Sequence, residues 1–149
     1  MLVLKGRNKY PRVLAIPSVR DRLVLGVLNR YLQAVYPDAA CMPVPNKIIS
    51  EVCKYLCFKE DDVNYIKTDF HDFYGSMVKR RLMAMLAERV KDVNALRLVK
   101  SAIDTPIVPD AAAPKKIKRS YKGIAQGLPI SNILASIYMM EFDESFGKK

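Results

Sequence analysis

The stretch 64–77, NYIKTDFHDFYGSM, constrains the fold most, because it joins a β-prone run to two acids and a helix signal. The run leads directly into Asp69, Asp72 follows, and Gly75 and Ser76 open a helical segment. A strand that ends in an acid can hold a metal ligand rigidly. The alternative is a strand end at which Asp72 and Ser76 cap the next helix. Both interpretations predict a strand before Asp69.

The composition bounds the size of the fold and the kind of partner. The chain has 149 residues, half of them hydrophobic, which suffices for one domain with a core. Lysine and arginine number 25 against 15 acids, and the formal net charge of +10 favours a polyanion such as nucleic acid. No apolar run approaches the roughly 20 residues of a membrane span, and the N-terminus lacks the order of a secretion signal. We expect no membrane partner.

The cysteines indicate a reducing compartment. Three thiols cannot pair evenly, and Cys53 and Cys57 lie four residues apart with no His or further Cys at zinc-ligand spacing. Buried reduced thiols are therefore favoured. The expected localisation is cytoplasmic.

Hydrophobic periodicity predicts helices over about 18–36, 46–58, 77–90 and 93–103, and from residue 130 onward. Ser18 and Asp92 are the predicted N-caps. The core-facing residues predicted for the first helix are Leu23, Val24, Val27, Leu28 and Tyr31, and those for the last are Ile130, Ile133, Leu134, Ile137 and Tyr138.

The remaining segments are predicted as short strands and loops. Residues 13–16 suggest a strand stopped by Pro17, residues 37–45 a loop, and residues 105–114 a loop or hairpin. Residues 115–122 carry five positive charges, which suit either phosphate contacts or a solvated basic hairpin. The cluster Lys79-Arg80-Arg81, on the helix predicted over 77–90, suits either a phosphate contact or an ordinary exposed face.

Three stretches resemble one known family. TDFHDFY, residues 68–74, resembles the first catalytic motif of reverse transcriptases, especially the bacterial retron and group II intron-like enzymes. RVLAIPSVRDRLVLGVLNRYL, from Arg12, resembles their fingers segment. GIAQGLPIS, residues 123–131, resembles their second motif through Gln126, Gly127 and Ser131. A departure is Ala125, where a proline is common.

The resemblance implies roles for individual residues. Asp69 and the main-chain carbonyl of Phe70 would bind Mg²⁺, of which the complete enzyme holds two ions. The Tyr74 ring would lie against C2′ of the incoming sugar and exclude a ribose hydroxyl, a steric block that would not need the tyrosine hydroxyl. The other implied nucleotide-binding residues are Arg12, Asp72, Phe73, Gln126 and Gly127.

The resemblance also implies an α+β fold class: mostly helical fingers with a partial right-hand palm, in which a short antiparallel sheet packs on helices. The implied divisions are 1–60 (fingers), 61–77 (palm strand and first motif), 78–127 (fingers return and basic hairpin) and 128–149 (palm helix). The paired aspartates of the third motif are expected beyond residue 149. The chain is therefore expected to be a fragment, inactive alone.

The implied activity is RNA-directed DNA polymerisation: deoxynucleoside triphosphates extend a DNA or RNA primer on an RNA template by two-metal nucleotidyl transfer. One alternative is a non-catalytic nucleic-acid-binding scaffold. Another is a polymerase that extends without a template in phage defence. Paired aspartates further along the parent chain would favour an enzyme.

Overall fold

A computed structural model describes residues 2–3, 12–40, 45–58, 66, 68–105 and 122–147. Most of these residues are helical. The helices are α1 (Val19–Val35), α2 (Pro37–Ala40), α3 (Pro45–Phe58), α4 (Phe73–Ser76), α5 (Lys79–Arg89), α6 (Val93–Asp104) and α7 (Ser131–Gly147), and the strands are β1 (Leu2–Val3) and β2 (Arg12–Val13).

The predicted α+β class, with a short antiparallel sheet packed on helices, is wrong. The two-residue strands β1 and β2 pair antiparallel, and beyond them the described residues show one isolated bridge, between Val78 and Lys122. Ile66 and residues 68–70, in the run predicted as a strand, are irregular. Ile66 is 91% exposed, so it has no neighbouring strand or apolar face to pack on. β-propensity depends on such packing.

Helix α1 begins where its sequence predicts. Ser18 is its N-cap, and the Ser18 side chain accepts a hydrogen bond from the Asp21 amide. The buried face, however, consists of Leu25, Leu28 and Leu32. The predicted core residues Leu23, Val24 and Val27 are 69%, 44% and 69% exposed. The helix carries two apolar stripes, and the neighbouring helices cover only one of them.

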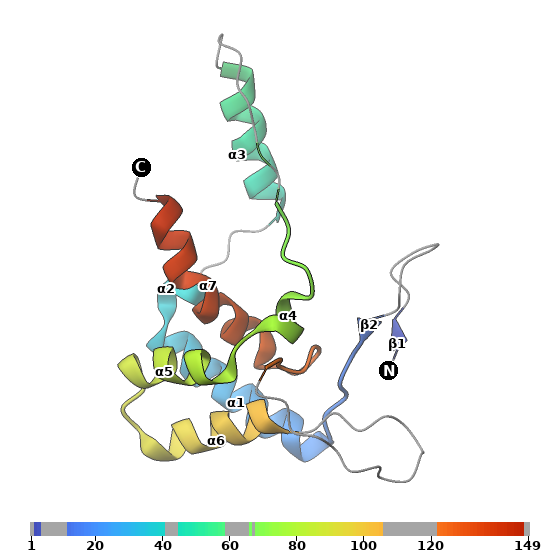
Figure 1. Ribbon diagram of the computed structural model, residues 1–149, viewed down its shortest axis with the longest axis vertical. Helices are drawn as coiled ribbons and strands as arrows, with labels where there is room; N and C mark the ends of the chain where they lie inside the picture. The colour runs from blue at the N-terminus through green and yellow to red at the C-terminus, as the bar shows by residue number, and fades with distance from the viewer. Residues whose placement is uncertain are drawn as a thin grey trace.

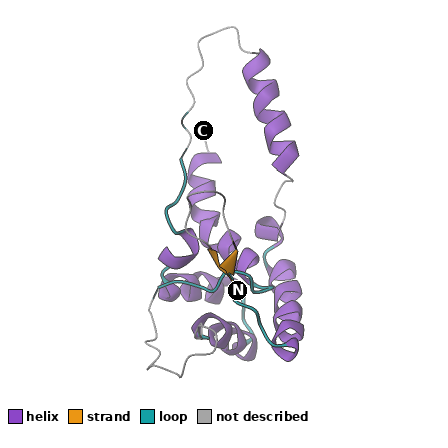
Figure 2. Cartoon of the chain, turned by 90° about the vertical axis from the view of Figure 1, so that its right-hand side faces the viewer, coloured by secondary structure: helices purple, strands orange, loops and turns teal. Residues whose placement is uncertain are grey.

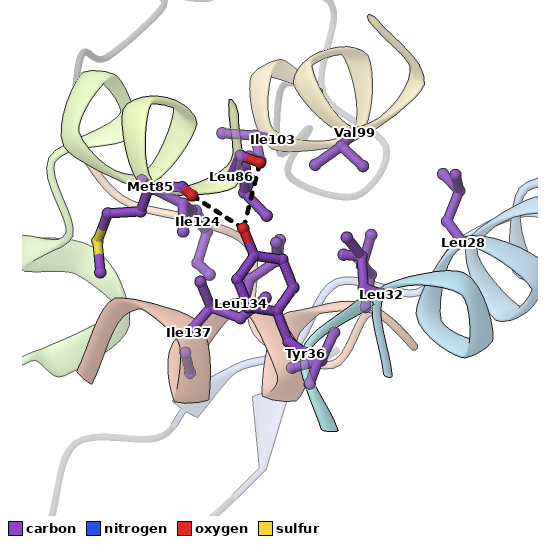
Figure 3. Packing of buried hydrophobic residues seen from close by; sticks show 14 of the residues in the cluster. Leu28, Leu32, Tyr36, Met85, Leu86, Val99, Ile103, Ile124, Leu134 and Ile137 are labelled. Carbon is purple, nitrogen blue, oxygen red and sulfur yellow. Dashed lines mark hydrogen bonds between the residues drawn. The ribbon is translucent and has the colours of Figure 1, made fainter. Parts of the chain in front are cut away.

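The core lies where α1, α5, α6 and α7 meet (Figure 1). Figure 3 shows Tyr36, just after α1, reaching across it: the phenol donates to the carbonyl oxygens of Met85 at 2.8 Å and Leu86 at 3.2 Å. Burial raises the pKa of Tyr36 above its ordinary value. The fully buried side chains are Leu32, Met77, Leu82, Leu86, Val90, Val99, Ile130, Leu134 and Ile137.

Two further predictions about helices are confirmed. Asp92 caps α6, accepting hydrogen bonds from the amides of Asn94 and Ala95. In α7 and the turn before it, the predicted inward residues Ile130, Ile133, Leu134 and Ile137 are buried, and Tyr138 is half-buried. Among the described helices, none combines the length and apolar character that a membrane crossing needs.

Helix α3 stands apart from the other helices in both views (Figures 1 and 2). Its apolar residues Ile48, Ile49 and Val52 are 44%, 59% and 51% exposed. Cys53 and Cys57 are exposed as well, so the prediction of buried thiols is wrong, because no described helix covers this face. Residues 37–40, predicted as part of a loop, form α2. Cys41 and the basic residues 115–121 lie outside the described residues.

Candidate functional site

The three stretches that the sequence singles out meet through main-chain hydrogen bonds. The Ala15 amide donates to the Gln126 carbonyl at 2.8 Å, the Ile124 amide to the Tyr74 carbonyl at 2.9 Å, and the Gly123 amide to the Met77 carbonyl at 2.8 Å. We call the meeting point, residues 14–15, 72–78 and 122–127, the three-segment junction. Segments far apart in the sequence are therefore adjacent in the fold.

Two glycines permit this close approach. Gly123 and Gly127 have positive φ angles of 83° and 93°, which L side chains rarely adopt. A Cβ at Gly123 would lie 3.1 Å from the Gly75 carbonyl oxygen, and one at Gly127 would lie 3.0 Å from the Ala15 carbonyl oxygen. Gly123 and Gly127, which bound the loop that carries Gln126, thus allow this loop to lie against the other two segments.

Asp72 has an unusual backbone at the start of α4. Its φ of 45° and ψ of 53° are left-handed, and its side chain makes no capping hydrogen bond. The carboxylate lies over Gly75, where an added Cβ would overlap it. Ser76 donates to the His71 carbonyl at 3.3 Å, and α5 begins after Val78. The capping interpretation therefore fails for both side chains. Positive φ at a non-glycine residue is a strained conformation that is frequent at functional sites.

Asp69 and Phe70 lie on the exposed, irregular segment that precedes Asp72. A carboxylate and a main-chain carbonyl are hard oxygen ligands of the kind Mg²⁺ prefers. No group of three or more His, Cys, Asp or Glu side chains suited to a metal ion occurs within the described ranges. The described residues alone therefore do not build the implied two-metal site.

Phe73 and Tyr74 lie in helix α4 and not in a strand, so strand alternation does not set the directions of their rings. Both are half-buried, and their rings meet edge to face with centroids 5.6 Å apart. The Tyr74 hydroxyl donates to the side-chain oxygen of Asn132 at 3.1 Å. The centroid of the Phe70 ring lies 5.8 Å from that of the Phe73 ring, so Phe70 adjoins this aromatic pair.

The structure describes the side chains of some of the other predicted nucleotide-binding residues and only the backbone of Arg12. Gln126 is half-buried and Gly127 exposed, both in the turn before α7. The backbone of Arg12 pairs with Val3 in the β1–β2 ladder, and its side chain lies outside the description. The junction therefore brings together Asp72, Phe73, Tyr74, Gln126 and Gly127.

The start of α7 supports the Gln126 loop. Ser131 is 2% exposed, and its hydroxyl donates to the Ala125 carbonyl at 2.6 Å. This bond fixes the loop at Ala125, where the motif that this stretch resembles commonly has a proline. Asn132, which contacts Tyr74, was not predicted from the sequence. The available signal was its neighbour Ser131, which lies in the first turn of α7 and contacts the loop.

Two of the three basic residues at the start of α5 contact other side chains of the chain. Lys79 lies 3.4 Å from Asp104, and Arg81 lies 2.6 Å from Glu141. The Arg81 guanidinium also lies over the Tyr138 ring, 5.5 Å from its centroid. Lys79 and Arg81 therefore have acidic partners within the chain. Arg80 is exposed.

Comparison with known proteins gives one relevant similarity. No family model matches the chain. The chain is similar to the uncharacterized 91 kDa protein in the cob intron of Schizosaccharomyces pombe, with 26% identity over 147 residues that cover 89% of this chain. It spans only 17% of the length of that relative. The similarity is thus to an intron-associated protein, over a small part of its length.

Proposed function

We propose that this chain forms the nucleotide-binding part of an RNA-directed DNA polymerase, of the kind found in group II introns and retrons. The observation that carries the proposal is the three-segment junction: main-chain hydrogen bonds join the Gln126 loop to the Tyr74 helix and to the segment after Arg12. These are the stretches that resemble the polymerase motifs. The similarity to a protein in an intron supports the same proposal.

The proposed chemistry divides among the residues of the junction. The left-handed turn at Asp72 presents the main chain before α4, where amide groups of residues 72 and 73 would meet a triphosphate. Gln126 and Gly127 would contact the sugar, and Arg12 the nucleotide. Asp69 and the Phe70 carbonyl are the proposed contribution of this chain to a Mg²⁺ site. The net charge of +10 suits an RNA template and its primer.

Primer extension tests this proposal in the natural protein that carries this chain. An RNA template, a DNA primer and deoxynucleoside triphosphates should give extension, and Asp69→Asn should reduce it to background while leaving the thermal unfolding midpoint nearly unchanged, because Asp69 is exposed. Asp143→Asn, the same change at an exposed position of α7, is the matched control. Extension by Asp69→Asn within a few-fold of the parent would contradict the role of this carboxylate.

A second candidate is a non-catalytic nucleic-acid-binding scaffold. The observation that favours it is the formal net charge of +10, which suits the binding of a polyanion and requires no catalytic residues. A binding titration with RNA should then show affinity that falls between about 50 and 200 mM salt. Binding without extension by the natural protein would favour the scaffold, and extension would exclude it.

A further inference from the structure

The Tyr74 side chain is anchored at its far end. Its hydroxyl donates to Asn132 Oδ1 at 3.1 Å, linking α4 to the first turn of α7. At the near end, the Tyr74 carbonyl accepts the Ile124 amide at 2.9 Å. The ring itself is half-buried and contacts Phe73 along one edge. The hydrogen bond from the hydroxyl thus restrains a ring that packing encloses only in part.

Asn132 is well placed to serve as a fixed acceptor. It is the second residue of α7, its predecessor Ser131 is buried and bonded to the Ala125 carbonyl, and its own carbonyl accepts the Ser136 hydroxyl at 3.1 Å. The first turn of α7 also packs in the core through Ile133 and Leu134. A side chain on such a rigid turn can orient its partner.

We propose that Asn132 is a positioning residue that fixes the orientation of the Tyr74 ring and so sharpens discrimination between deoxyribonucleotides and ribonucleotides. This inference rests on the proposed polymerase function. A ring that excludes a 2′-hydroxyl must stay in place when the larger sugar pushes against it. Without the Asn132 bond, the half-exposed ring can turn toward solvent and admit the hydroxyl. The tyrosine hydroxyl is then needed after all, contrary to the expectation from sequence.

The experiment measures single-nucleotide incorporation by the natural protein, with matched deoxy and ribo substrates, as the ratio of the two kcat/KM values. Asn132→Ala and Tyr74→Phe should each lower the ratio about two- to tenfold, the loss of one hydrogen bond. The double variant should lower it no further, because both changes remove the same bond. Asn132→Asp keeps an acceptor oxygen and should retain the parental ratio.

Asn94→Ala is the matched control, since Asn94 is also an exposed second residue of a helix. It should leave the ratio unchanged. Thermal unfolding checks that each variant is folded. If Asn132→Ala does not fold, the ratios measured for Tyr74→Phe and Asn132→Asp test the inference. These variants separate loss of the hydrogen bond from a general effect of changing an exposed asparagine near a helix start.

The outcomes distinguish this inference from the proposed function. No deoxynucleotide incorporation by the parent protein overturns the function and this inference with it. Incorporation with an unchanged ratio in Asn132→Ala overturns the role of Asn132 alone. Equal losses from Asn132→Asp and Asn132→Ala, or losses that multiply in the double variant, also overturn that role, because the hydrogen bond would not be their cause.

Discussion

Replacing Gly127 by alanine should destabilise the protein by about 2–3 kcal/mol. The φ of 93° at Gly127 is a left-handed conformation that costs an L-residue about 1–2 kcal/mol. The new Cβ would lie 3.0 Å from the Ala15 carbonyl oxygen, so the segment before α1 must move away. That movement weakens the hydrogen bond from the Ala15 amide to Gln126, a loss of about 0.5–1.5 kcal/mol.

Gly26→Ala is the control, and its effect should have the opposite sign. Gly26 lies inside α1, and a Cβ added there meets nothing within 4 Å. Alanine should therefore stabilise the helix by about 0.5–1 kcal/mol. The free energies of unfolding come from urea titrations followed by circular dichroism, with the slope checked for each variant.

Two results would refute this reasoning. One is a free energy of unfolding for Gly127→Ala within about 0.5 kcal/mol of the parent, because the loop would then tolerate a side chain. The other is the same sign for both variants, because the effect would then reflect glycine replacement in general and not the contact between Gly127 and Ala15.

Three further predictions concern stability. Leu32→Ala should cost about 2–5 kcal/mol and Leu23→Ala less than about 0.5, because the same helix buries Leu32 and leaves Leu23 69% exposed; equal costs in urea titrations would contradict the assigned face. Burial raises the pKa of Tyr36 above 10.0, so the folded state keeps this proton to a higher pH than the unfolded state. The resulting stability is fully present below the unfolded pKa and declines as pH rises through the folded pKa, and Tyr36→Phe should make the measured decline shallower. Ser18→Ala should cost about 0.5–2 kcal/mol by removing the cap of α1, whereas Ser50→Ala on exposed α3 should be nearly neutral.

Features that depend on neighbouring residues in the chain were predictable. The caps Ser18 and Asp92 bond to amides two or three residues away, so the signal and its partner lie in the same short stretch. The inward residues of α7 were also predicted from its own stretch, and Ile133, Leu134 and Ile137 are buried. In the candidate site, the roles of Gln126 and Gly127 are implied by the resemblance of residues 123–131 to the second reverse-transcriptase motif, and they stay predictions.

Features that depend on a distant partner were decided by the tertiary structure. The run before Asp69 is β-prone, but no sheet receives it in the described part of the chain, and a strand needs partners for its main chain. In α1, Leu25 is buried and Leu23 is exposed, because the neighbouring helices pack against the face that carries Leu25.

The sequence by itself therefore determined the five longer helices and the N-caps Ser18 and Asp92. Only the tertiary structure decided that the Gln126 loop contacts Ala15, and that the Tyr74 hydroxyl meets Asn132 across 58 positions of the chain. The physical reason is that a helix satisfies its hydrogen bonds within its own stretch. The junction takes its hydrogen bonds from segments that only folding brings together.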